Sequence, residues 1–293
     1  LNLSKTFYTF YRNLNMNAIE KKMVSLLAEL SAQHNVIGVK AEFEAEGTRI
    51  EEAMRLKDVT SLAGLDLNIK IGGCEAIKDM FDTINLGARR VIAPMIETPY
   101  ALEKFLNASQ VVFKDILDSI ELLINIETYT AVKNLSEMLK VPSIKHLSGI
   151  VLGRVDMCGS LGLERTEVNS QVILDIALEI SHKAKQHGLT VVVGGGVSFE
   201  SISFFQAFPQ GGIDRFETRK IIFSCPNALN NTKESFLKAV EFELLWLKNK
   251  SNHYSAISNE DKKRIEMMER RYQTAITDIY DLKENKMTEN ISS

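Results

Sequence analysis

The chain has 293 residues, of which 45% are hydrophobic and 25% are charged, and its formal net charge is -3. This is the composition of a soluble globular protein with one large domain or two smaller ones. The chain lacks the large positive charge with which proteins bind nucleic acid or an anionic membrane surface, and this excludes electrostatic binding of either kind. The widely spaced Cys74, Cys158 and Cys225, the lack of a signal-like apolar start and the absence of any run of transmembrane length lead us to expect a cytoplasmic protein with free thiols.

Short β-rich runs alternate along the chain with amphipathic helical patterns. We expect strands at 36–44, 65–73, 89–96, 120–127, 147–157, 190–196 and 213–223, with a weak one at 6–11. Helices are expected at 49–63, 74–86, 99–113, 128–140 and 169–187, after cap-like residues such as Thr48, Thr98 and Asn169. This alternation is typical of parallel strands joined by crossover helices, and the number of strands favours a (β/α)8 TIM barrel over residues 1–228.

The last part of the chain, residues 229–293, has a different pattern. Residues 231–250 predict a strongly amphipathic helix, and a second helix is expected after a break at 251–259. The apolar residues of this second helix recur at alternating steps of three and four, as in a heptad repeat: Ile265, Met268, Tyr272, Ala275, Ile279 and Leu282. This stripe either packs on the chain's own barrel or forms a contact between subunits.

Polar side chains recur on one face of several predicted strands. Successive side chains of a strand point to opposite faces, so each strand of a barrel directs one set inward, where Val, Ile and Leu are usual. Here the inward sets include Lys40, Glu42, Glu44, Asn68, Lys70, Asn125, Glu127, Arg154, Asp156, Arg215, Glu217 and Arg219. Because several of these residues lie near the C-terminal strand ends, where barrel active sites are found, they predict a functional site.

Two of these carboxylates, Glu127 and Asp156, end neighbouring strands. Mg²⁺ in proteins is usually bound by one or two carboxylates together with waters and ligand oxygens. A buried carboxylate must recover a large desolvation cost, and a salt bridge from Glu127 to Arg154 or Lys70 would do so equally well. The residues alone leave both interpretations open.

Four stretches resemble the HpcH/HpaI aldolase and citrate lyase β-subunit family: "IKIGGCEAIKDMFDTINLGARRVIAPM", "IAPMIETPYAL", "LLINIETYTAVKN" and "IVLGRVDMCGSLGL". The similarity runs from about residue 36 to 225. The resemblance implies a TIM barrel that binds Mg²⁺ or Mn²⁺ through Glu127 and Asp156. It also implies the making or breaking of a carbon–carbon bond through an enolate, in a 2-oxo acid or in an acyl-CoA substrate, and a homo-oligomer in which terminal helices reach neighbouring subunits.

Several positions depart from the family's pattern. Lys70 stands where the aldolases usually have an arginine and Arg154 where a proline is usual, so both are expected to place positive charge beside the enolate. Glu44 is the expected proton carrier. Further substrate contacts are expected from Asn125, Gly72, Gly153, Glu42, Glu217 and Arg219. These departures indicate a divergent branch with its own substrate.

Two other functions fit the same residues. Lys70 would be a Schiff-base nucleophile if its amine were neutral. Alternatively, the barrel would bind a keto or sugar acid without turnover. The triplet Gly194–Gly196 lacks the P-loop lysine and the dinucleotide fingerprint, so we expect it to leave room for a ligand or for neighbouring backbone.

Overall fold

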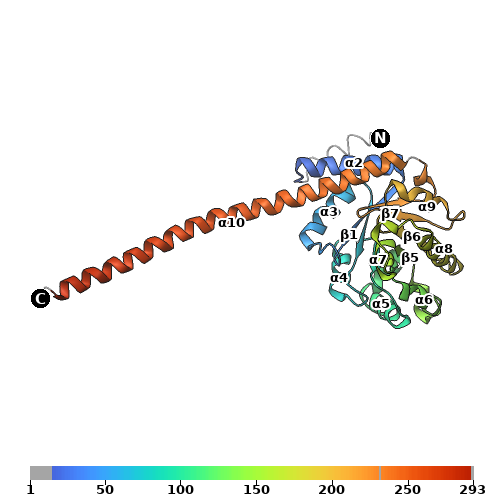
Figure 1. The fold of residues 1–293 in the computed structure, drawn as a ribbon, viewed down its shortest axis with the longest axis horizontal. Helices are drawn as coiled ribbons and strands as arrows, with labels where there is room; N and C mark the ends of the chain where they lie inside the picture. Colours follow the sequence, from blue (N-terminus) through green and yellow to red (C-terminus); the bar gives the residue numbers. More distant parts are fainter. Residues whose placement is uncertain (1–14, 231, 292–293) are drawn as a thin grey trace. The chain divides into compact units, whose positions relative to one another are not determined.

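The computed structural model describes residues 15–230 and 232–291, with side chains up to residue 277. The chain forms two compact units, of which the first ends at Trp246 and the second begins at Leu247. The first unit is a closed barrel of eight strands that follow one another around the ring in chain order. Figure 1 shows strands in the middle of this unit with helices around them. The predicted TIM barrel is therefore confirmed. The weak strand predicted at 6–11 lies outside the described residues.

The strands of the barrel are β1 Val36–Glu42, β2 Asp66–Lys70, β3 Arg90–Ala93, β4 Glu121–Ile126, β5 Gly149–Gly153, β6 Thr190–Gly194, β7 Arg215–Glu217 and β8 Ile221–Ser224. Neighbours from β1 to β7 are parallel, whereas β8 is antiparallel to both β7 and β1. The prediction of one strand at 213–223 was wrong. Thr218 closes a tight turn, in which its backbone N–H donates to the Ile221 carbonyl and its hydroxyl accepts from the Ile221 N–H. The eighth strand thus comes from the second half of that stretch.

The helices around the barrel are α2 Ala18–His34, α3 Ile50–Leu62, α4 Ile77–Asn85, α5 Pro99–Val112, α6 Tyr129–Met138, α7 Arg154–Ser160, α8 Gln171–Gln186 and α9 Ile202–Gln206. The predicted helices are present, and Thr98 is confirmed as the cap of α5, with its side chain accepting from the Ala101 N–H. Arg49 and Ser170, rather than Thr48 and Asn169, directly precede α3 and α8. Strand β5 ends four residues earlier than predicted, because the chain turns into α7 at Gly153.

The barrel interior has three levels. At the N-terminal strand ends, Arg90 pairs with Asp66 and Glu121, and Glu121 pairs also with Arg215. Above them lies an apolar layer made of Ile92, Leu123, Val151 and Val192. Asn68 joins the first network by accepting a hydrogen bond from Arg90, and the remaining polar side chains named above follow at the C-terminal strand ends. The apolar layer therefore separates a structural ion-pair network from the predicted site.

The last helix, α10, runs from Thr232 to Ile291 without interruption. The predicted break at 251–259 was wrong, since that stretch contains no glycine or proline and its serines and asparagines only weaken a helix. Helix residues up to Trp246 belong to the barrel unit, where Phe236, Phe242 and Trp246 are buried. None of the helices among the described residues is both long and apolar enough to cross a membrane.

Candidate active site

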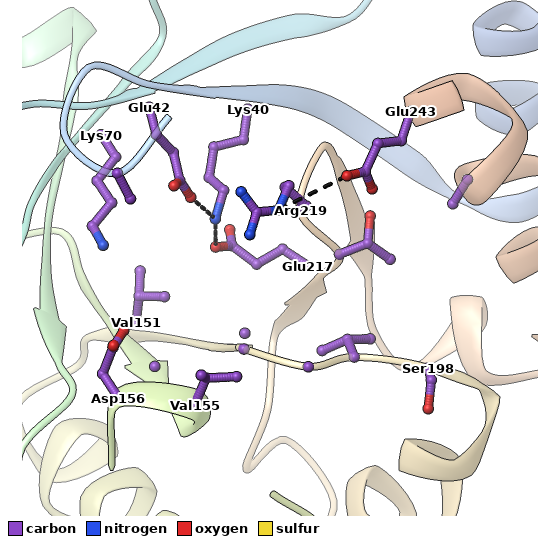
Figure 2. Close-up of a pocket in the computed structure, with 18 of the residues that line it drawn as sticks. Lys40, Glu42, Lys70, Val151, Val155, Asp156, Ser198, Glu217, Arg219 and Glu243 are labelled. Carbon is purple, nitrogen blue, oxygen red and sulfur yellow. Dashed lines mark hydrogen bonds and ion pairs between the residues drawn. The ribbon is translucent and has the colours of Figure 1, made fainter. Parts of the chain in front are cut away.

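A cavity of about 690 Å³ lies at the C-terminal ends of the strands (Figure 2). The residues predicted from the sequence that line it are Glu42, Glu44, Lys70, Asn125, Glu127, Gly153, Asp156, Glu217 and Arg219. Gly72 and Arg154 do not line it. Most of the residues that were predicted from the alternation of side chains along the strands therefore lie in one cavity.

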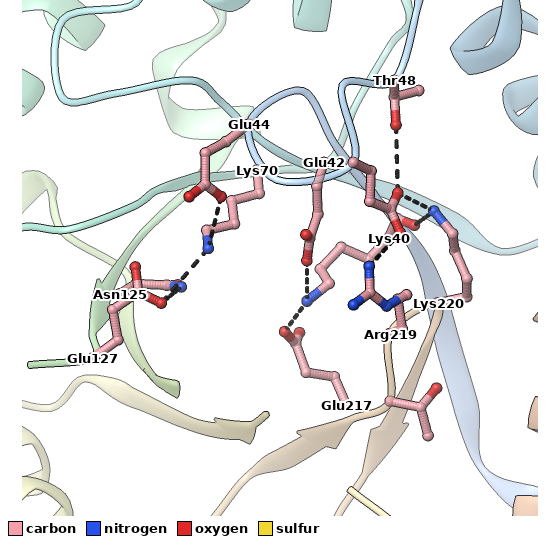
Figure 3. A network of polar contacts seen from close by, with 12 residues as sticks. Lys40, Glu42, Glu44, Thr48, Lys70, Asn125, Glu127, Glu217, Arg219 and Lys220 are labelled. Carbon is pink, nitrogen blue, oxygen red and sulfur yellow. Dashed lines mark hydrogen bonds and ion pairs between the residues drawn. The ribbon is translucent and has the colours of Figure 1, made fainter. Parts of the chain in front are cut away.

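The first lysine cluster consists of Lys70, Glu44 and Glu127. Lys70 ends β2, and its Nζ lies 3.0 Å from Glu44 Oε2 and 3.6 Å from Glu127 Oε2 (Figure 3). Burial alone would lower the pKa of Lys70, but the charges of Glu127 and Glu44 outweigh it and raise the pKa above its ordinary value. Lys70 is therefore a charged ammonium at neutral pH and a poor nucleophile.

Glu127 is almost completely enclosed, with 1% of its surface exposed. Its Oε1 accepts from the Met95 N–H at 3.0 Å, and its Oε2 accepts from Asn125 Nδ2 at 2.7 Å. Burial raises the pKa of Glu127, and Lys70, Asn125 and Met95 oppose that rise. Gly153 makes room for the carboxylate, because a Cβ at that position would lie 2.7 Å from Glu127 Oε2. Glycine is thus required beside this carboxylate.

Three oxygen-bearing side chains in the cavity are suited to a hard cation. Asp156 lies in the first turn of α7 and is exposed to the cavity, and the buried Asn125 Oδ1 has no hydrogen-bond partner. Together with Glu127 they offer only oxygen donors, which Mg²⁺ and Mn²⁺ prefer. No group of three or more His, Cys, Asp or Glu residues suited to a metal occurs among the described residues. A cation here would therefore rely on two carboxylates and on oxygens from substrate and water.

The second lysine cluster consists of Lys40, Glu42 and Glu217. Lys40 Nζ lies 2.5 Å from Glu217 Oε1 and 3.0 Å from Glu42 Oε1, as Figure 3 shows. Burial would lower the pKa of Lys40, but Glu217 and Glu42 raise it well above its ordinary value. The pKa of Glu42 is lowered, because Lys40 outweighs the effect of burial. All three residues are buried, and the shifted pKa values of Lys40 and Glu42 keep these two groups charged at neutral pH.

A third pairing beside the cavity was not predicted. Lys220 is buried and pairs with Glu46, whose other oxygen lies 3.7 Å from Arg219 Nη1. The side chain of Arg219 is 51% exposed and also approaches Glu243, at 3.8 Å. Glu46 lies in the loop between β1 and α3. Only the unpredicted β7–β8 hairpin brings Lys220 to it, so the pairing could not be found without that turn.

Arg154 faces away from the cavity. It is fully buried and pairs with no carboxylate among the described residues, and burial lowers its pKa to about 10. Its guanidinium lies 4.7 Å from the Phe204 ring centre. It donates hydrogen bonds of 2.6 to 3.3 Å to oxygens of Val168, Asn169, Gly194 and Ser201. Because α7 begins at Arg154, the two-residue period of the strand no longer applies there, and the side chain is not among those that line the cavity.

Gly72 lies just past β2, outside the cavity lining. Its N–H donates to Asp79 Oδ2 at 2.8 Å, and a Cβ at Gly72 would lie 3.0 Å from the same oxygen. The glycine therefore leaves room for the start of α4 rather than for a ligand.

A closed eight-stranded barrel with seven parallel strands, and with carboxylates and lysines at the C-terminal ends of those strands, has the architecture of a TIM barrel. Residues 50–211 match the HpcH/HpaI aldolase/citrate lyase family. This match covers more than half of the chain, and the chain belongs to that family. No curated protein matches the sequence.

Several solved structures share the fold. An HpcH/HpaI aldolase from Desulfitobacterium hafniense DCB-2 is 14% identical with a TM-score of 0.56, over 70% of this chain and 83% of that chain. Citrate synthase SbnG is 16% identical with a TM-score of 0.54, over 78% of this chain and 90% of that chain. Malate synthase of Haloferax volcanii, solved as a lead(II) complex, is 14% identical with a TM-score of 0.50, over 65% of this chain and 62% of that chain. At these identities the similarity shows the fold, and the family supports a lyase or aldolase type of activity.

Proposed function

We propose that this chain is a metal-dependent carbon–carbon lyase of the aldolase type that acts on a 2-oxo acid. The observation that carries the proposal is the meeting of Glu127, Asp156 and Lys70 in one cavity at the C-terminal strand ends, in a member of the HpcH/HpaI family. This arrangement combines two carboxylates for a cation with a fixed positive charge. It suits a reaction in which negative charge develops on a keto oxygen.

Glu127 and Asp156, with the unpartnered Asn125 Oδ1 beside them, would hold Mg²⁺ or Mn²⁺. Such an ion supplies Lewis-acid polarisation of the keto group. Gly153 and Asn125 keep the Glu127 carboxylate in place for this role, since the first leaves it space and the second donates a hydrogen bond to it.

Two residues of the first lysine cluster would act on the substrate directly. The Lys70 ammonium stabilises negative charge as it develops, in a buried environment where such an interaction is strong. Glu44 lines the cavity, with 29% of its side chain exposed and its carboxylate paired to Lys70. It is therefore placed to accept and return a proton, directly or through water.

The proposal is tested with the purified 293-residue chain and Mn²⁺. Two readouts are used: cleavage of oxaloacetate or of a 4-hydroxy-2-oxo acid, and exchange of the pyruvate methyl hydrogens for deuterium followed by proton NMR. We expect both activities to be lost with chelator and restored by Mn²⁺. Full activity in metal-free buffer would remove the metal mechanism. Absence of turnover and exchange with every 2-oxo acid tried would instead favour a barrel that only binds its ligand.

We further propose that residues 1–228 form the catalytic barrel, that the first turns of α10 up to Trp246 complete it, and that the rest of 229–293 assembles the chain into a homo-oligomer. Three residues at heptad spacing in the second unit are exposed: Ile265 (56%), Met268 (53%) and Tyr272 (66%). Such a stripe on a long helix suits contact with another helix. Removal of 259–293 should lower the number of subunits per particle, calculated from the molar mass measured by light scattering, whereas an unchanged number of subunits would contradict the assembly role.

A further inference from the structure

Helix α10 is exposed on all sides over most of the second unit. Within 251–277 every side chain is exposed apart from the half-buried Tyr254 and Ile276. Helices in proteins owe most of their stability to the packing of an apolar face, or in long polar helices to many charge pairs between successive turns. No side chain between residues 255 and 277 forms an ion pair with another described residue. The stability of this stretch therefore depends on a partner outside the single chain.

The apolar side chains of this part of α10 lie on one face. Their spacing is that of a heptad repeat in which Ile265 occupies position a and Met268 position d. The outer positions b, c and f hold polar or charged residues, with Ala256 and Met267 as the exceptions. A face of this kind is the contact surface of a coiled coil. Positions a and d between 247 and 277 form a seam, which consists of Leu247, Ser251, Tyr254, Ser258, Asp261, Ile265, Met268, Tyr272 and Ala275.

The charged residues beside the seam indicate which partner fits it. In a parallel pair of helices in register, position g of one helix faces position e of the next heptad in the other. Arg264 is such a g residue and Glu269 is the e residue opposite it, so a symmetric dimer contains two pairs of opposite charge. An antiparallel pair instead brings g residues together, and Arg264 and Arg271 both occupy g. The charges therefore fit a second copy of this chain whose helix runs in the same direction.

We propose that α10, over 251–277, forms a parallel, in-register, two-stranded coiled coil with the same helix of a second copy of this chain. The inference rests on the proposed assembly role of the C-terminal segment, and it adds the partner, the number of helices and their direction. Two strands are favoured because Ile265 at position a is β-branched and Met268 at position d is not. The polar Ser258 and Asp261 interrupt the seam, and polar residues at core positions lower the stability of a coiled coil but fix its register.

Direction and register are tested by cysteine cross-linking in the purified 293-residue chain. Ser251→Cys and Met268→Cys each place a thiol in the seam, at sites about 25 Å apart along the helix. Only parallel helices in register bring both thiols next to their counterparts in the second copy. We expect mild oxidation to give a disulfide-linked dimer with each variant, seen by electrophoresis without reductant. Cross-linking at one site alone, or at neither, would overturn the proposal.

Ala256→Cys and Thr277→Cys are the matched controls. Both positions are exposed and lie at position f, on the side of the helix opposite the seam. They should give no more dimer than the parent protein, whose own three cysteines set the background. Equal yields from the seam and the control positions would show random collision instead of a paired helix, and would also overturn the proposal.

Charge reversal tests the pairing of Arg264 with Glu269. In the Ser251→Cys protein, Arg264→Glu replaces two pairs of opposite charge in the dimer by two like-charge pairs. It should therefore lower the initial rate of disulfide formation by about tenfold. Adding Glu269→Arg should restore the rate. A rate that the first change leaves unaltered, or that the second change does not restore, would contradict the parallel register.

The outcome is separable from that of the assembly role itself. A lower number of subunits after removal of 259–293, with no cross-linking at either thiol of the seam, removes the coiled coil alone. Cross-linking at both thiols, with an unchanged number of subunits after that removal, instead removes the assembly role alone.

Discussion

Glu127→Gln separates a metal site from a salt bridge. The variant keeps the side-chain shape, and its remaining oxygen still accepts from the Met95 N–H. Asn125 is able to turn its amide so that Oδ1, now without a partner, accepts from the new NH₂ group. Removing one partner of a buried ion pair typically costs about 3–5 kcal/mol when the other charge is left unpaired. Lys70 is not left unpaired, because Glu44 lies nearer to it than Glu127 does.

We therefore expect the free energy of unfolding without metal to change by only about 1 kcal/mol, a shift of roughly 2–4 °C for a chain of this size. Burial raises the pKa of Glu127, so neutralising this group also relieves a desolvation cost. In the parent protein, Mn²⁺ at a hundred times its Kd should add about 2.7 kcal/mol. The variant should lose most of that gain, and Glu121→Gln should retain it.

Thermal melts of parent and variant, each with and without Mn²⁺, decide between the two interpretations. A variant that melts far below the parent in both buffers, with no effect of Mn²⁺ on the parent, would refute the reasoning. Glu127 would then serve as the structural partner of Lys70, and the metal-dependent mechanism would fail with it.

Three further outcomes are expected. Arg154→Lys keeps the charge but cannot reach four oxygens, and we expect urea unfolding to give a loss of about 2–4 kcal/mol; an unchanged unfolding midpoint would contradict this. Borohydride with pyruvate should leave no adduct in the intact mass, because the raised pKa of Lys70 keeps it protonated; a reduced adduct on Lys70 would replace the metal mechanism. Burial would raise the pKa of Glu121, but hydrogen bonds from Arg215 and Arg90 lower it below its ordinary value of 4.5. The contribution of Glu121 to the free energy of unfolding is therefore full above pH 4.5 and is lost as the pH falls through the lowered pKa. The stability gap between parent and Glu121→Gln, from urea titrations between about pH 3 and 7, should therefore narrow in acid, and a constant gap would count against the ion pairs.

The barrel was predictable because its first strands keep their apolar runs between clear helical patterns. The β7–β8 hairpin was not, since the stretch 213–223 has no glycine, proline or asparagine at the turn, and Thr218 closes it with its own hydroxyl. Helix α2 was missed, although Asn17 and Glu20 form a capping box at its start. For α10 the error was the opposite one, because a break was predicted where none exists: the weak helix formers at 251–259 were interpreted as the end of a helix.

The direction of a side chain at the site was predictable for residues that lie on strands, because side chains alternate there with a period of two. Lys40, Lys70 and Glu217 lie on strands, and their alternation placed them correctly on the inner face. Arg154 follows Gly153, where the period changes to that of a helix, and no property of the residue itself marks this change. Ion-pair partners such as Lys220 and Glu46 depend on the closure of the barrel, which local sequence does not encode.

Strand β8 is antiparallel to both of its neighbours, so Ser224 at its end lies close to Val36 at the start of β1. The cavity wall that a last crossover helix would otherwise provide is instead supplied by the first turns of α10, from Lys233 to Glu243. Leu237 and Val240 in this wall are 71% and 62% exposed, so substitutions there should change stability by less than about 0.5 kcal/mol. The groups proposed to be catalytic and the cavity wall beside them are thus encoded in separate parts of the chain. Mutation can reshape the entrance, and with it the range of substrates admitted, without altering the strand ends.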